Sequence, residues 1–181
     1  PVATLPVRET PPLPTVSFIV RNGVYIDLVD VYIRPAGGSS WGADRLTSPS
    51  ICIGLEASIS ITAGYYDVRV LDIYGHAMYE EYNRAIGADA NYRTLEVAPD
   101  VGFTLQNGYP FDVCKLEIMP PGGSWQKLYD VADGGGVFTM GTTRDFTHRA
   151  GNYQMRVTNC CATSLLAGLY IYPGMPTVVM I

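Results

Sequence analysis

The sequence predicts an all-β protein made of two tandem Greek-key-like β-sandwich domains that follow a proline-rich arm. Three observations support this fold class: the composition, an internal repeat and the regular spacing of turn residues. The 181 residues include 19 Gly, 13 Pro and 13 Tyr, but only 16% are charged. This balance favours short strands joined by tight turns over amphipathic helices, which need a charged face.

The internal repeat is seen when the two halves of the chain are placed side by side. The first copy reads Phe18, Asn22-Gly23, Asp27, Pro35, Gly37-Gly38-Ser39, Trp41, and the second reads Phe103, Asn107-Gly108, Asp112, Pro120, Gly122-Gly123-Ser124, Trp125. Their offset is 85 residues, or 84 at the tryptophans, and it becomes 87 where Ala63-Gly64 matches Ala150-Gly151. We therefore predict a duplication, with an arm at residues 1–15, a first domain at 16–98 and a second at 99–181.

The turn residues and prolines of each copy predict where its strands begin and end. The Asn-Gly pairs are expected to form tight turns, because both residues tolerate positive φ. After the first pair, Val29, Val31 and Ile33 alternate with other residues, as on one face of a strand, and Pro35 ends that strand. A single short helix is expected around residues 77–86.

The four cysteines predict disulfides in an oxidising compartment, because the chain is β-rich and their number is even. Cys114 lies in phase with the inward residues of its strand, and so does Cys161, which predicts a Cys114–Cys161 bridge in the second domain. Cys52 and Cys160 are then left to join the domains or two subunits. The alternative is four free thiols buried in a cytosolic protein.

Two segments carry a family resemblance. They are Trp41-Gly42-Ala43-Asp44-Arg45-Leu46 and the run from Tyr66 to Asp72, which includes Tyr66-Asp67-Val68-Arg69. Together with Asn22-Gly23 they resemble a widespread secreted bacterial β-sandwich module with an Asn-x-x-Gly, Ser-Pro, Trp-Gly-x-Asp-x-Leu and Tyr-Asp-hydrophobic-Arg pattern. The second copy keeps Trp125 but not the Gly-x-Asp after it. The resemblance implies a β-sandwich and a secreted location; the tandem architecture is similar to that of extracellular filament or tubule subunits.

Charge and hydropathy exclude several functions. The net charge of −5 argues against nucleic acid, whose phosphates need a basic surface. No run of about 18 apolar residues is present, so we expect no membrane span. The chain begins at Pro1 without an initiator Met, so we expect that a leader was removed or that the chain was trimmed.

No catalytic or metal site is predicted, and no cofactor is expected. His76 and His148 are the two histidines, and we expect the first in a turn and the second half-buried on a strand. Glu80 and Glu81 are adjacent, so on a strand they point to opposite faces and cannot share a substrate. The acidic residues do not form an Asp-x-Asp-x-Asp loop, so a Ca²⁺ site is not expected. We therefore expect the protein not to be an enzyme.

Two functions from different classes remain. The first is a structural subunit of an extracellular polymer, in which the arm docks on a neighbouring subunit through Val2, Leu5, Val7 and Leu13. An arm with five prolines should be disordered alone, so it needs a partner surface; the alternative is that it packs on its own domains. The second function is a secreted or cell-surface module that binds a glycan or protein, with Trp41 and Trp125 as possible stacking platforms. The alternative for both tryptophans is packing at the sandwich rim.

Overall fold

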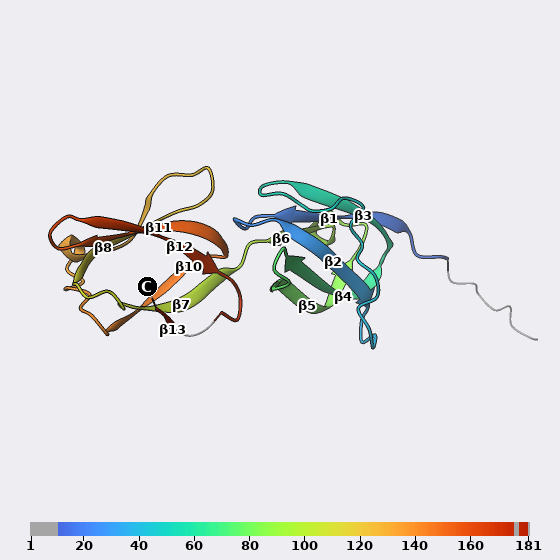
Figure 1. The fold of residues 1–181 in the computed structure, drawn as a ribbon. Helices are drawn as coiled ribbons and strands as arrows, with labels where there is room; N and C mark the ends of the chain where they lie inside the picture. The colour runs from blue at the N-terminus through green and yellow to red at the C-terminus, as the bar shows by residue number, and fades with distance from the viewer. Residues whose placement is uncertain (1–10, 176–177, 181) are drawn as a thin grey trace, which may run out of the picture.

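In the computed structural model the chain is all-β, which confirms the predicted class. The structure describes residues 11–175 and the backbone of residues 178–180. Figure 1 shows the strands gathered in two lobes, one from the N-terminal half of the chain and one from the C-terminal half. Two short 3-10 helices lie in the described residues, η1 (Ala90–Tyr92) and η2 (Val131–Asp133).

The N-terminal half contains six strands in two sheets. They are β1 (Thr15–Asn22), β2 (Leu28–Pro35), β3 (Glu56–Thr62), β4 (Gly64–Asp72), β5 (Ala77–Ile86) and β6 (Thr94–Val97). One sheet has the order β3-β1-β6 and the other β2-β4-β5, so the chain passes between the sheets at almost every connection. The pairs are antiparallel except β1 with β6, which is parallel.

The C-terminal half repeats this arrangement with one additional strand. Its strands are β7 (Asp100–Gln106), β8 (Val113–Met119), β9 (Gln126–Asp130), β10 (Thr143–Arg149), β11 (Gly151–Asn159), β12 (Ser164–Ile171) and β13 (Val178–Met180). The sheet orders are β10-β7-β13 and β12-β11-β8-β9, and β13 is parallel to β7 as β6 is to β1. Strand pairing thus divides between Val97 and Asp100, at the boundary between the two repeat copies. That each half folds as an independent domain stays a prediction.

A buried core lies between the two sheets of each half. In β1 the alternation places Val16, Phe18 and Val20 inside, and from the facing sheet Val31 and Val70 meet them, all 7% exposed or less. The C-terminal half uses the equivalent strands in the same way, with Leu105, Leu116, Ile118, Met155 and Val157 buried. Period-two alternation therefore locates the core faces correctly.

The helix expected around residues 77–86 is wrong, because this segment is β5. It pairs with β4 along its length, and its buried residues Met78 and Ile86 face the core. The register shifts twice, and one shift lies near Asn83, which has φ 59° and donates its amide to the buried Asp67 carboxylate at 3.0 Å. This irregularity interrupts the alternation that marks a strand, and it explains why the segment lacks a clear strand pattern.

The two Asn-Gly pairs do not form the expected positive-φ turns. Their asparagines are instead buried, and each side chain hydrogen-bonds to three backbone groups, an arrangement that we call a bracket. Asn22 is fully buried, and its side-chain amide donates to the carbonyls of Ile26 and Ile51 at 2.9 and 2.8 Å. Its side-chain oxygen accepts the Val24 amide at 3.0 Å. Asn107 makes the equivalent three bonds in the other half. Each bracket ties the segment after the first strand to the loop that precedes β3 or β10.

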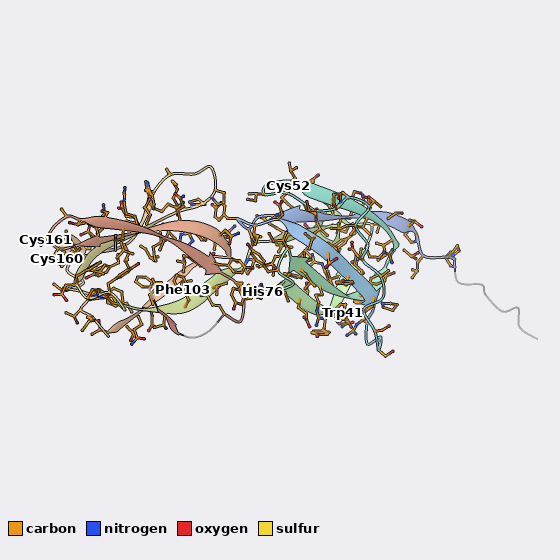
Figure 2. All side chains as sticks on the ribbon, in the orientation of Figure 1. Trp41, Cys52, His76, Phe103, Cys160 and Cys161 are labelled. Carbon is orange, nitrogen blue, oxygen red and sulfur yellow. A yellow bond between two sulfur atoms is a disulfide. The ribbon has the colours of Figure 1, made fainter. Side chains whose placement is uncertain are left out.

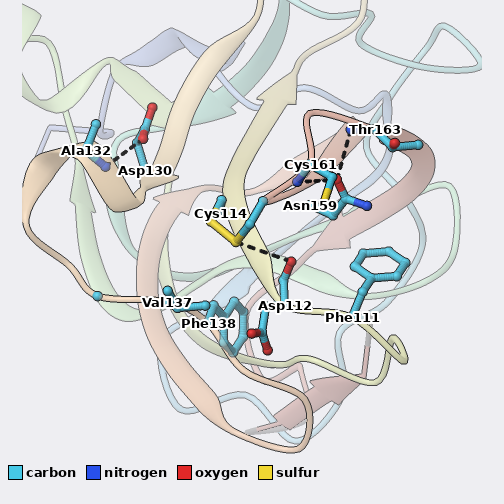
Figure 3. Close-up of a disulfide and its surroundings, with 12 residues drawn as sticks. Phe111, Asp112, Cys114, Asp130, Ala132, Val137, Phe138, Asn159, Cys161 and Thr163 are labelled. Atoms are coloured by element: carbon cyan, nitrogen blue, oxygen red, sulfur yellow. Dashed lines mark hydrogen bonds between the residues drawn. A yellow bond between two sulfur atoms is a disulfide. The ribbon is translucent and has the colours of Figure 1, made fainter.

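The predicted Cys114–Cys161 bridge is wrong: the disulfide joins Cys114 to Cys160, with Cα atoms 4.9 Å apart (Figure 3). Strand β11 shifts register after Thr158 and ends at Asn159, so the inward phase of Met155 and Val157 does not extend to the cysteines. The Asn159 side chain accepts the amides of Cys161 and Thr163, both at 2.9 Å, and so holds a turn. That turn leaves Cys161 exposed, and Cys52 is likewise an exposed free thiol.

Candidate functional site

The two halves of the chain are joined by a backbone contact between Tyr25 and Gly151. These residues form a parallel bridge, in which the Tyr25 amide donates to Ala150 and the Tyr25 carbonyl accepts from Asn152, both at 3.1 Å. A Cβ atom on Gly151 would lie 2.5 Å from the Tyr25 Cβ, and Gly151 has φ +145°. Only glycine therefore allows this approach, because a side chain would collide with the Tyr25 backbone. We call this contact the joint.

A second contact between the halves surrounds the Asp72 carboxylate, which is fully buried. Asp72 accepts the backbone amides of Tyr74 and His76 within its own turn, at 2.8 and 2.9 Å. It also accepts the hydroxyl of Tyr170, which comes from β12 of the other half. The His76 ring lies 3.2 Å from that hydroxyl through Nδ1 and stacks on Tyr172 at 4.0 Å between ring centroids. Figure 2 shows His76 at the meeting of the two lobes, so it occupies a turn, as predicted, and also an interface.

These contacts fix the orientation of one half against the other. Halves joined only by a flexible linker are expected to move relative to each other. Here the link between β6 and β7 has two residues, 98 and 99, and the joint supplies backbone hydrogen bonds beside it. The Asp72 cluster adds a buried, charge-assisted hydrogen bond, which is stronger than a bond between neutral groups. Figure 1 shows the two halves end to end, in an elongated molecule joined by these contacts.

Trp41 lies over the outward face of the β2–β4–β5 sheet, not at the sandwich rim. The guanidinium carbons of Arg34 and Arg69 lie 4.1 and 4.5 Å from its ring centroid. Tyr82, at 6.2 Å from the same ring, is 58% exposed. The cation–π contacts hold the indole against the sheet, and the exposed tyrosine beside it leaves an aromatic surface whose two arginines are paired with Asp67 and Glu80.

A buried acid, Asp67, holds Arg34 of this surface in place. Asp67 receives the Nε–H of Arg34 at 2.9 Å and the Gly37 amide at 3.2 Å, in addition to the Asn83 amide. The Asn83 amide, followed by Arg34 and Gly37, lowers the pKa of Asp67 below its ordinary value against the effect of burial. The carboxylate therefore stays ionised and fixes Arg34 under the indole.

Trp125 repeats the arrangement in the C-terminal half with a single arginine. Arg156, the repeat equivalent of Arg69, lies 4.4 Å from its ring centroid and pairs with Glu117 at 2.6 Å. Lys115 contacts the same carboxylate at 2.9 Å. Burial raises the pKa of Glu117, but these two cations outweigh it, so its pKa lies below the ordinary value. Both tryptophans are half-buried, so each is a packed residue with one partly accessible side.

In the part of the chain that the structure describes, the surface grooves and the remaining titratable side chains do not gather into a second candidate site. A groove of about 380 Å³ borders the joint, lined by the loop after β8 and by Asn152, Tyr153 and Gln154. His148 is half-buried on β10, as predicted, and its ring nitrogens lie 3.0 Å from the Tyr153 hydroxyl and 3.1 Å from Gln126. Within the described residues, no three His, Cys, Asp or Glu side chains are placed to hold a metal ion, and no helix is long and apolar enough to cross a membrane.

The predicted arm contacts fall mostly outside the described residues. Val2, Leu5 and Val7 lie there, whereas Leu13 is 63% exposed on the segment that precedes β1. The Pro14 carbonyl accepts the Ala63 amide at 2.8 Å, which directs that segment away from the end of the N-terminal half that faces the other half (Figure 1). Cys160 and Cys161 lie at the opposite end of the molecule (Figure 2). The disulfide there indicates a non-reducing environment.

Sequence reasoning missed the joint and the Asp72 cluster. Gly151 was recognised as a repeat position equivalent to Gly64, but the three atoms nearest to a Cβ added at Gly64 all belong to the side chain of Tyr66, in the same half. The available signal was local: Asp72 is followed by aromatic residues in a turn, and Tyr170 and Tyr172 alternate on a later strand. Neither pattern identifies its partner, because the contact joins residues 98 positions apart.

Comparison with known proteins identifies no family. No family model matches the chain, and no curated protein matches it. Among solved structures, the Bacillus anthracis TIE protein is similar with a TM-score of 0.34 and 8% sequence identity. The match covers 92% of this chain and 33% of that protein, so the chain spans about a third of its length.

Proposed function

We propose that the protein is a secreted structural subunit that assembles head to tail into an extracellular polymer, without catalytic activity. The observation that carries the proposal is the pair of contacts between the halves. Because the Tyr25–Gly151 bridge and the Asp72 cluster join the two lobes, the segment at residues 11–14 that leads into β1 and the Cys160 turn lie at opposite ends of the molecule. A contact that links opposite ends of identical subunits propagates into a filament, or into a ring if it closes.

The disulfide supports a location outside the reducing cytoplasm. Cys114 and Cys160 join β8 to the turn after β11, close to one end of the molecule. A covalent bond at that end resists local unfolding where a neighbouring subunit would exert force. The exposed thiol of Cys161 lies in the same turn and is accessible to a partner.

The test is the assembly state of the oxidised full chain and of a chain without residues 1–14. Sedimentation velocity over a concentration series, with negative-stain imaging, should show polymers for the full chain and folded monomer for the truncated chain. Circular dichroism of both chains checks that the truncated one remains folded. A full chain that stays monomeric at high concentration would refute the assembly role.

A second candidate function has support from the surface at Trp41. The indole and the exposed Tyr82 provide a stacking face of the kind that binds a sugar ring, and the two arginines beneath them are paired with Asp67 and Glu80. Titration of Trp fluorescence with a glycan panel should show quenching that Tyr82→Ala weakens. Trp125→Ala provides the matched control, because its site has one arginine. Equal responses of the two variants would argue against a Trp41 site.

A further inference from the structure

Each half closes its first sheet with a short parallel strand. In the N-terminal half β6 pairs with β1, with Ile19 opposite Thr94 and Val20 opposite Leu95. In the C-terminal half β13 pairs with β7, with Thr104 opposite Val178. Ile19 and Thr104 are repeat equivalents, so both closing strands have the same register.

The hydrogen bonds of β6 show what such a strand requires. The carbonyls of Arg93 and Val97 accept the amides of Ile19 and Gly23, at 2.7 and 2.9 Å. In a parallel ladder, alternate residues direct both backbone groups to the same neighbour, so residues 93, 95 and 97 face β1 and residues 94 and 96 face away. Leu95 and Val97 are 3% and 0% exposed, whereas the Glu96 side chain is exposed. A closing strand therefore needs apolar residues at its second and fourth positions, and its third position needs no N–H.

The arm contains a segment that meets these requirements. Residues 4–7 read Thr-Leu-Pro-Val, and β6 reads Thr-Leu-Glu-Val, so three of the four residues are identical. The one difference places Pro6 at the Glu96 position, where the backbone N–H faces away from the sheet. Proline is tolerated at such a position because no ladder hydrogen bond is lost.

We propose that residues 4–7 of one copy pair in parallel with β7 of a second copy, in the place of β13, with Leu5 and Val7 in the positions that Leu95 and Val97 occupy on β1. This inference rests on the proposed function and names the surface that receives the arm. Strand addition to a sheet edge gives affinity through the backbone and specificity through alternate side chains.

The sheet of the C-terminal half is the acceptor that leaves the link between the halves intact. Strand β6 lies between η1 and the two residues that lead into β7, so an exchange of strands at β1 would disturb that link. Docking on β7 also repeats the connectivity within the chain, where the strand that closes one half continues into the first strand of the next half.

The chain between the arm motif and β1 is long enough for this connection. Residues 8–14 form a spacer of seven residues, compared with two between β6 and β7. A proline-rich spacer of that length extends about 20 Å. It is therefore long enough to connect two subunits even where they make no contact like the joint or the Asp72 cluster.

The test is disulfide trapping between full-length chains in which Cys52 and Cys161 are replaced by Ser. One preparation carries Thr4→Cys, and the other, distinguished by a mass tag, carries Thr104→Cys. The register places these two residues directly opposite each other, so oxidation of the mixture should yield the mixed disulfide, identified by peptide mass mapping. The matched control mixes Thr4→Cys with Ile19→Cys, which occupies the equivalent place on β1.

The outcomes separate the inference from the proposed function. A polymer that yields the Thr104→Cys disulfide and not the Ile19→Cys disulfide supports the inference. A polymer that yields the Ile19→Cys disulfide, or neither, overturns docking on β7 and leaves the assembly role standing. Chains that remain monomeric overturn both.

A second measurement addresses the apolar positions of the motif. Leu5→Asp should raise the concentration required for assembly by about 100-fold, because it places a charge where an apolar side chain is buried. Leu13→Asp is the control, since this exposed residue lies in the spacer. Equal effects of the two variants would contradict a specific role for residues 4–7.

Discussion

The joint predicts that Gly151→Ala is far more damaging than Gly64→Ala, although the two glycines occupy the same repeat position. At Gly151 the new Cβ would lie 2.5 Å from the Tyr25 Cβ and 2.8 Å from its backbone, at a φ of +145°. At Gly64 the new Cβ would meet only the Tyr66 side chain, at 3.3 Å, and no unusual φ is needed. The comparison therefore isolates the contact between the halves.

The expected magnitude follows from what Gly151→Ala removes. Backbone strain at an unfavourable φ costs about 1–3 kcal/mol. Separating the halves to relieve the clash breaks the two hydrogen bonds of Tyr25 with Ala150 and Asn152, at about 1 kcal/mol each. We expect Gly151→Ala to lower the free energy of unfolding by about 3–5 kcal/mol and Gly64→Ala to change it by about 1 kcal/mol or less.

Denaturant unfolding monitored by Trp fluorescence and by far-ultraviolet circular dichroism measures both variants. Because Trp41 and Trp125 lie in different halves, loss of the joint should also separate one transition into two. The reasoning would be refuted by equal destabilisation of the two variants. It would also be refuted if Gly151→Ala kept a single transition at the wild-type midpoint.

Three further predictions concern the C-terminal half. Asn107→Ala removes three hydrogen bonds from a fully buried bracket and should destabilise the protein by about 2–4 kcal/mol in denaturant titration, whereas an unchanged midpoint would show that the bracket is dispensable. Replacing both Cys114 and Cys160 by Ser should cost about 3–4 kcal/mol under oxidising conditions, and Cys161→Ser should cost less than about 0.5 kcal/mol; a cost of Cys161→Ser as large as that of the double replacement would restore the pairing rejected above. Burial lowers the pKa of His148 below 6.5, so the unfolded chain takes up its proton first and stability should fall as the pH drops from 6.5 towards the lower folded pKa. His148→Gln should remove that part of the pH dependence of the melting temperature, and an identical pH profile would contradict a buried neutral imidazole.

The sequence predicted the strands because each repeat copy constrains the other. Offsets of 85 and 87 residues placed β1 against β7 and β4 against β11, and alternation then identified inward residues such as Val31 and Ile33. The same reasoning failed where a strand ends or shifts register. The phase of β11 could not be extended past Thr158, and the irregularity at Asn83 concealed β5.

The contacts between the halves could not be predicted by repeat reasoning, because they are absent from one copy. Tyr25 and Pro110 are repeat equivalents, but proline has no amide to donate, so the hydrogen bond that Tyr25 makes at the joint has no counterpart. A comparison of the two repeat copies identifies the residues that they share, whereas the joint is formed by a residue, Tyr25, that differs between them.

The same comparison explains why assembly would need the arm. The turn held by Asp72 and the turn held by Asn159 are repeat equivalents, and each side-chain oxygen accepts two backbone amides. In the first turn Tyr74 and the carboxylate contact the other half, whereas in the second turn Cys161 stands where Tyr74 does, and a neutral amide replaces the carboxylate. The Asn159 turn therefore lacks the groups that form the Asp72 cluster, and a neighbouring copy could not be bound there by a second cluster of that kind. In the proposed assembly, a strand supplied by the arm would provide backbone hydrogen bonds that do not depend on those side chains.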